Sequence, residues 1–247
     1  MKIAVIVSQT PDTTTKVVIS KDGKSIDDTG ITWILNPYAE FAIEKALKLK
    51  EANPKVDEII LITMGPERNA EALRQGLAMG ADRAVLLKAD SINTELMASK
   101  IKELGVDLVL GGKKTIDSES SWLEAGVAAH LDLAYIHCAN KLEWSGDELL
   151  ASREVSGEQQ NFKVALPALI TCDKGVDEPR YASIMGIMKA KKKSIDEVAA
   201  SGSDNIGIEI VQAFLPEPRG SVKLFDGTPK EAAEKLLKAL REEAKVL

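Results

Sequence analysis

A glycine-lysine loop is the part of the sequence with the clearest capacity to bind a charged ligand. Gly111 and Gly112 follow an apolar run, and glycine lets backbone amides approach a ligand closely. Lys113 and Lys114 add positive charge, and a helix predicted to begin near Ser120 can hold an anion with its free N–H groups. The loop therefore predicts a nucleotide site. Most such loops are plain turns, and the sequence has neither a Walker motif nor GxGxxG after its first strand, so the plain-turn interpretation stays open.

Residues suited to catalysis are few. His130 and His137 are the only histidines, and neither stands at a metal-ligand spacing from Cys, Asp or Glu. Asp117 and Glu119 could form an acid–base pair, but beside two lysines we interpret them as residues that fix the loop. No Ser-His-Asp elbow is present. The sequence predicts no self-contained active site.

Composition excludes several classes of function. The net charge of −6 and the aromatic content of 4% argue against nucleic-acid binding. The two cysteines, Cys138 and Cys172, are too few for a disulfide scaffold or a zinc cluster. No apolar stretch approaches the roughly 20 residues of a membrane span, and the start MKIAVIVSQ has no signal-peptide features. We expect a cytoplasmic protein without direct membrane insertion.

The elements that would position the loop alternate along the chain. Apolar runs at 3–7, 58–63, 84–87 and 106–110 have strand length, and helical patterns separate them. This alternation predicts an α/β fold with a doubly wound, mainly parallel sheet. Ligands of such sheets bind beyond the carboxyl ends of the strands, here near Ser8, Met64 and Gly111. From Lys141 the pattern changes to antiparallel hairpins, with turns near 145–147 and 156–157.

The stretch 177–193, DEPRYASIMGIMKAKKK, suits a surface that meets another protein. It is extended and Pro-broken at its start, apolar in its middle and basic at its end, and charge of this kind speeds encounter with an acidic partner. A merely solvated basic face is the alternative. Beyond it we predict a C-terminal arm over 194–247 that wraps a partner, with a last helix from Pro229. A helix folded back on its own domain, 1–193, is the other possibility.

Several motifs together resemble one family, the beta subunits of electron transfer flavoproteins (ETFs). They are, in order, MKIAVIVSQTPD, NPYAEFAIEKALKLKE, LRQGLAMGADRAVLL, GGKKTID, LPALIT and EPRYASIMGIMKAKKK, and they extend over most of the chain. The resemblance implies a Rossmann-like, adenine-nucleotide-binding fold and a heterodimer with an ETF alpha subunit, which makes most of the contacts to an electron-carrying FAD. In ordinary members the beta subunit holds AMP. In bifurcating members it holds a second FAD that exchanges electrons with NADH.

The resemblance also assigns roles to individual positions. The expected nucleotide contacts are Ile6, Asn36, Pro37, Tyr38, Ala39, Met64, Gly112, Lys113, Lys114, Thr115, Ile116, Asp117, Ser118, Glu119, Ser120 and Ser121. Thr13 and Tyr38 match positions near the alpha-subunit flavin, and Arg153 with Glu154 matches a pair that contacts the mobile flavin domain. The expected partner-docking residues are Ile184, Lys189, Lys191, Lys192 and Lys193.

Departures from the family pattern bear on the ligand and on the partner. Lys114 stands where the family has Gln, and Trp122-Leu123-Glu124 replaces a small, polar triplet. The added bulk would close the space that a second flavin needs, which favours AMP. The sequence motif that begins at Asn36 is also common among bifurcating members, so a second FAD remains possible as the ligand. Ile184 in place of Leu, next to Met185 in place of Pro, leaves the docking partner undetermined.

The function implied is electron carriage rather than self-contained catalysis. Electrons would come from a dehydrogenase, such as an acyl-CoA dehydrogenase, through the alpha-subunit FAD, and would pass to an ETF-quinone oxidoreductase. An NADH-oxidising, bifurcating ETF is the first alternative. A stand-alone adenine-nucleotide-binding protein without a redox role is the second.

Overall fold

A parallel sheet of seven strands forms the centre of the molecule. The computed structural model describes residues 1–200, 210–218 and 220–247. The strand order is β12-β5-β4-β1-β6-β11-β7, and each neighbouring pair is parallel. The strands are β1 (Lys2–Ile6), β4 (Glu58–Gly65), β5 (Arg83–Lys88), β6 (Leu108–Gly112), β7 (Ala134–Ala139), β11 (Ala168–Cys172) and β12 (Asp196–Ala199). The predicted parallel sheet is confirmed.

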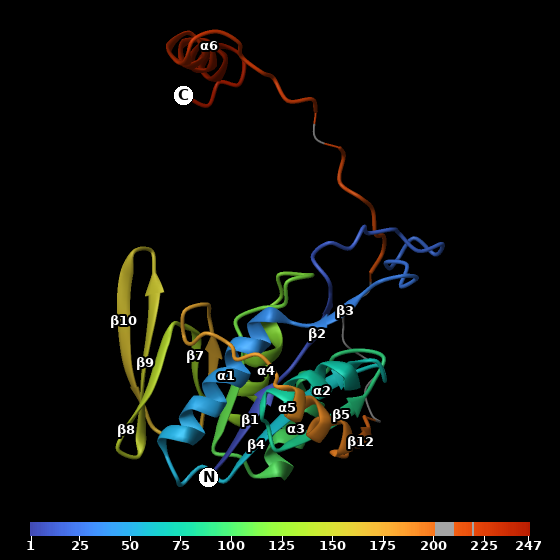
Figure 1. Cartoon of the computed structure of the whole chain (residues 1–247), viewed down its shortest axis with the longest axis vertical. Coiled ribbons are helices and arrows are strands. Elements are labelled where there is room, and N and C mark those ends of the chain that lie inside the picture. The colour runs from blue at the N-terminus through green and yellow to red at the C-terminus, as the bar shows by residue number, and fades with distance from the viewer. Residues whose placement is uncertain (201–209, 219) are drawn as a thin grey trace. The chain divides into compact units, whose positions relative to one another are not determined.

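Helices cover both faces of this sheet (Figure 1). One face packs against α1 (Pro37–Ala52), α2 (Asn69–Met79) and α5 (Ile184–Lys192). The other packs against α3 (Thr94–Leu104) and α4 (Trp122–Leu131). Because both faces are covered, successive strand residues such as Ile59, Ile60, Leu61 and Ile62 are all fully buried, which explains why the strands appear as continuous apolar runs. The doubly wound α/β fold is confirmed.

The chain reverses its winding direction at β1. From β1 it moves through β4 to β5 on one side, and then crosses to β6 on the other. The carboxyl ends of β1 and β6 therefore flank a crevice, which is where ligands of open α/β sheets bind. Pro37 begins α1 at this edge, and Gly105, at a φ of 62°, ends α3 in the left-handed conformation at the opposite edge, just before β6.

Two small antiparallel sheets accompany the main one. The first consists of β8 (Lys141–Ser145), β9 (Glu148–Val155) and β10 (Glu158–Val164), which confirms the predicted hairpins. It is fixed to α1, because the Trp144 indole donates to the Leu49 carbonyl at 3.0 Å and the Lys45 ammonium to the Leu142 carbonyl at 2.9 Å. The second pairs β2 (Gln9–Pro11) with β3 (Trp33–Leu35), directly after the carboxyl end of β1.

The stretch 177–193 contains a helix, α5, that the sequence pattern did not predict. Ser183 caps it by accepting a hydrogen bond from the Gly186 N–H at 3.0 Å. Gly186 lies so close to α2 that a Cβ there would stand 2.4 Å from the Ala78 carbonyl oxygen. The helix is thus specified by a cap and by a close contact with another helix, and neither signal shows in local periodicity.

The described chain divides into two compact units. One contains residues 1–17 and those described between 28 and 209, and the other contains 18–27 and those described from 210 onward. In the second unit, Ile19 bridges Ile26 and the Ala213 N–H donates to the Gly23 carbonyl at 2.7 Å. Its helix α6 (Pro229–Glu242) begins with a capping box of Thr228 and Glu231 and ends four residues before the predicted Val246. No residue of α6 is buried.

Candidate functional site

A cavity of about 170 Å³ lies beyond the carboxyl ends of β1, β4 and β6. It occupies the crevice that the reversal of strand order creates. Six of the predicted nucleotide contacts line it, and they come from all three strand ends: Ile6, Met64, Thr115, Asp117, Ser118 and Ser120. The fold therefore brings together residues that are more than a hundred positions apart in sequence.

Polar atoms without a partner lie in and beside this cavity. The Gln9 Oε1, in the cavity wall, is buried and accepts no hydrogen bond. The same is true of the Oγ1 of Thr10, the next residue in sequence, and of the Oδ1 of Asn36, which lies against the glycine-lysine loop. Asn36 begins α1, yet its side chain does not cap that helix. Its Nδ2 donates instead to the Lys114 carbonyl at 2.9 Å. Buried acceptors normally have donors, so these atoms are available to a water or a bound group that donates hydrogen bonds.

The glycine-lysine loop packs against the first turn of α1. A Cβ on Gly112 would stand 2.7 Å from the Tyr38 carbonyl carbon and 2.9 Å from the Ala39 nitrogen, so only glycine fits. The ammonium groups of Lys113 and Lys114 lie 5.7 and 5.8 Å from the centre of the Tyr38 ring. The predicted contacts at 36–39 and 112–114 are thus brought together, next to the cavity.

Both lysines of this loop already have acidic partners. The Lys113 Nζ lies 2.8 Å from the Asp173 Oδ2, and that hydrogen bond raises the pKa of Lys113 above its ordinary value. Lys114 pairs with Glu119, which supports our interpretation of Glu119 as a loop-fixing residue. Their positive charge is therefore largely balanced before any ligand binds.

Helix α4 points its first turn at the cavity. The Ser121 side chain does not cap this end, and the Glu124 carboxyl accepts a hydrogen bond from its own N–H. Trp122, Leu123 and Glu124, in that turn, all line the cavity. The Glu124 side chain covers Gly111, where an added Cβ would stand 2.7 Å from the Glu124 Cγ. Glu124 forms no ion pair with any described residue, and burial raises its pKa to about 7.

A hydrogen-bonded group next to Glu124 escaped the sequence analysis. The His137 Nδ1 lies 3.0 Å from both the Tyr135 hydroxyl and the Thr171 Oγ1, and the Thr171 Oγ1 accepts from the Cys138 N–H at 2.9 Å. Burial, followed by the charges of Arg153 and Lys113, lowers the pKa of His137. These residues come from β7 and β11, and only their adjacency in the sheet, which no local motif reveals, could have identified them.

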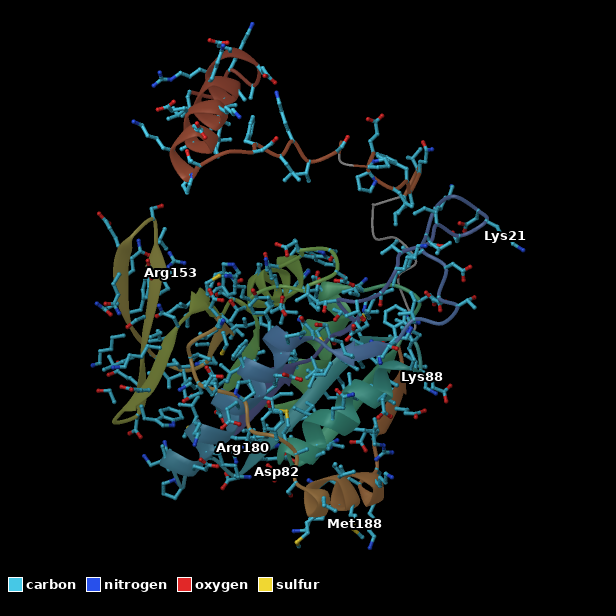
Figure 2. The ribbon with its side chains drawn as sticks, turned by 45° about the horizontal axis from the view of Figure 1, so that its top comes forward. Lys21, Asp82, Lys88, Arg153, Arg180 and Met188 are labelled. Carbon is cyan, nitrogen blue, oxygen red and sulfur yellow. The ribbon has the colours of Figure 1, made fainter. Side chains whose placement is uncertain are left out.

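Of the residues predicted to lie near the flavin or its domain, Tyr38 packs against the glycine-lysine loop, whereas Thr13, Arg153 and Glu154 do not line the cavity. Thr13 is exposed in the loop after β2. Arg153, on β9, donates from Nε to the Gln160 Oε1 at 2.9 Å, and Glu154 beside it is exposed. Figure 2 shows Arg153 on the small sheet, at its end. These roles stay predictions.

The predicted docking residues form an exposed ridge on α5. Ile184 is 79% exposed, Met185 and Met188 are also exposed, and Met188 projects from the free side of the helix in Figure 2. Lys189, Lys191 and Lys192 are exposed beside them. Lys193 differs, because it is half-buried and its ammonium donates to the Ala81 carbonyl at 2.5 Å.

Ion pairs and hydrogen bonds hold this ridge in place. Arg180 binds the buried carboxylate of Glu44 with two hydrogen bonds of 2.8 Å and also reaches Glu51 at 2.8 Å. Burial alone would raise the pKa of Glu44, but the hydrogen bonds from Arg180 outweigh it and lower that pKa. At the other end, the Arg74 guanidinium donates to the carbonyls of Ala190 and Lys193 at 2.8 and 2.6 Å. A groove of about 710 Å³ lies between this segment and α1 and α2.

The described residues contain neither a membrane-spanning helix nor a metal-binding cluster. Within 1–200, 210–218 and 220–247 no helix is both long and apolar enough to cross a membrane. The same residues contain no cluster of three or more His, Cys, Asp or Glu side chains that could bind a metal ion.

The doubly wound sheet with a cavity at its switch point defines an α/β protein of the class that binds ligands at the carboxyl edge. Comparison with known proteins identifies the family. The family model described as the electron transfer flavoprotein domain matches residues 24–203. The electron transfer flavoprotein subunits beta of Bacillus subtilis and Bradyrhizobium diazoefficiens are each 38% identical over the whole of both chains. The human subunit beta is 33% identical over 80% of this chain and 81% of its own. The chain belongs to the electron transfer flavoprotein family, as a beta subunit.

Proposed function

We propose that this chain works as half of a heterodimeric electron carrier. An alpha subunit is its partner and provides most of the contacts to FAD. Electrons come from a dehydrogenase, of the acyl-CoA dehydrogenase type, and leave towards an ETF-quinone oxidoreductase. Membership in the ETF beta-subunit family supports this role. We also propose that the chain binds an adenine nucleotide in the cavity at the switch point.

The chemistry of the cavity fits the nucleoside part of such a ligand. The adenine amino group and the ribose hydroxyls are hydrogen-bond donors, and the Gln9 Oε1 in the cavity wall is a buried acceptor without a donor. Apart from the Glu124 N–H, which its own carboxyl accepts, the first turn of α4 offers N–H groups to a phosphate. Ile6 and Met64 give the cavity an apolar wall for the base.

The size of the cavity supports AMP rather than a second FAD. Its volume of about 170 Å³ is small for a ligand site, and AMP, the smaller of the two ligands, requires less widening of the cavity than FAD. Glu124 fills the space above Gly111, where a longer ligand would have to extend. A bifurcating role, which requires a second FAD in this place, therefore has less support.

The remaining roles use surfaces of this chain. When bound, FAD supplies the electron chemistry, and the protein supplies enclosure and nearby charge. Tyr38, with Lys113 and Lys114 beside its ring, and Thr13 would face the flavin, and Arg153 with Glu154 would contact its domain. The α5 ridge would bind the dehydrogenase. Exposed apolar residues of the second unit, including Phe214, Leu224 and Leu237, would bind the alpha subunit, as the arm prediction requires.

The test is to co-express the chain with the alpha subunit of its own organism and to quantify extracted cofactors. One FAD per heterodimer together with AMP supports the proposal. Two FAD per heterodimer would establish the bifurcating alternative. A colourless product, or a stable monomer that forms no complex, would contradict the electron-carrier role.

A further inference from the structure

Glu124 is a carboxyl group in an unexpected place. It lines the cavity, accepts a hydrogen bond from its own N–H in the first turn of α4, where a phosphate would bind, and forms no ion pair with a described residue. A carboxylate and a phosphate are both anions, and both are attracted to the positive end of a helix dipole. The protein has therefore placed its own anion at the end of the cavity where the ligand's anion would bind.

The charged groups around Glu124 do not neutralise its negative charge. Asp117, from the loop after β6, is a second acid in the cavity wall. Lys113 and Lys114, from the same loop, are engaged with Asp173 and Glu119. From β7, Tyr135 faces Glu124, and burial followed by the charge of Glu124 raises the pKa of its hydroxyl to about 12, so it stays neutral. At neutral pH and above, a phosphate in this cavity meets more negative than free positive charge.

From this arrangement we propose that Glu124 is a specificity-determining residue: it opposes the ligand's phosphate, so that this chain binds its adenine ligand mainly through the nucleoside. The inference rests on the proposed nucleotide-binding function and refines it. It follows that AMP binds no more tightly than adenosine.

The decisive experiment measures adenosine and AMP binding to the heterodimer by calorimetry, at about pH 8.5, where a carboxyl with a pKa of about 7 is ionised. In Glu124→Gln the side chain keeps its shape and loses its charge. We expect AMP to bind at least about tenfold more tightly than to the wild type, because like charges within several ångströms repel strongly in a partly enclosed site. Adenosine affinity should change less than about twofold, since adenosine carries no charge.

A second variant separates charge from bulk. Glu124→Gly removes both, and should bind AMP as tightly as Glu124→Gln while also taking up FAD during co-expression. Unchanged alpha-subunit FAD in both variants would show that the heterodimer is intact. The inference is overturned if Glu124→Gln affects adenosine and AMP equally, or weakens AMP. If neither ligand binds to any of the three proteins, the proposed nucleotide function fails as well, a result distinct from binding without a phosphate-specific change.

Discussion

The cavity at the switch point and the ridge on α5 are opposite kinds of surface. In and beside the cavity, apolar residues are buried and several polar atoms lack partners, among them the Gln9 Oε1 and the Asn36 Oδ1. At the ridge, Arg180 binds the Glu44 carboxylate and Arg74 donates to a backbone carbonyl of α5, whereas apolar side chains such as Ile184 are exposed. The first arrangement suits a small polar ligand, and the second suits an apolar patch on a protein. One chain thus presents two incomplete surfaces that different molecules would complete.

The strongest test of this contrast removes the anchor of the ridge. Arg180→Ala would leave the buried Glu44 carboxylate unpaired, and should lower the free energy of unfolding by about 2–4 kcal/mol. Because Arg180 holds the pKa of Glu44 below its ordinary value of 4.5, the stabilisation exists above that pH and disappears as the pH falls through the folded-state pKa. Urea denaturation of wild type and variant at several pH values measures this difference. Lys238→Ala, which breaks an exposed pair with Glu242, is the control and should change little.

A substitution on the ridge itself should affect partner binding alone. Ile184→Ala removes the most exposed aliphatic side chain of α5, and should slow electron transfer from the dehydrogenase about tenfold, since a buried isoleucine contributes more than 1 kcal/mol at an interface. FAD content should stay unchanged. Leu150→Ala, an exposed leucine on β9, provides the matched control. If FAD and transfer rate fell together, the ridge would not be a separate docking surface.

The cavity should respond to pH in a higher range than the anchor of the ridge does. Burial raises the pKa of Glu124 to about 7, so the folded protein retains a proton there that the unfolded chain loses above about 4.5. Stability relative to Glu124→Gln should therefore fall between these values, by on the order of 2 kcal/mol, and level off above them. Denaturation midpoints from pH 4.5 to 8 test this expectation.

The smallest effect should come from the charges beside the ridge. Replacing Lys189 and Lys191 together by alanine should slow association with an acidic dehydrogenase only a fewfold at low salt, and not at high salt, because these exposed charges steer encounter. Stopped-flow association rates across ionic strength give the measurement. Lys141→Ala changes an exposed lysine on β8 instead and should leave the rate unaltered. Equal slowing by both changes would mean that general charge, not the ridge, governs encounter.

The sequence predicted the main sheet well because burial on both faces leaves an unmistakable pattern. The runs 3–7, 58–63, 84–87 and 106–110 correspond to β1, β4, β5 and β6, and the turns near Gly146 and Gly157 join the strands of the small sheet. It did not predict α5 or β12. The first depends on the contact of Gly186 with α2, and the second, Asp196–Ala199, has no apolar periodicity and gains its conformation by pairing with β5.

The candidate site was partly predictable. The glycine-lysine loop and the positions after β1 and β4 were found because strand ends mark ligand sites in this architecture. The hydrogen-bonded group of Tyr135, His137 and Thr171 was missed, because Thr171 lies 34 residues after His137, on a strand whose pairing the sequence does not reveal. Glu124 was recognised only as added bulk. Its lack of an ionic partner became visible in three dimensions.

The short strand β12 determines where the chain can be truncated. It covers β5, and the pairs Arg83–Asp196 and Lys88–Glu197 fasten it there, at 2.6 Å each. A chain shortened to end at Lys193, just past the ridge, would leave β5 as an open, largely apolar edge, which invites aggregation with other copies. Fragments meant to isolate the first unit should therefore extend at least to Ala200, whose N–H donates to the Lys88 carbonyl at 3.0 Å.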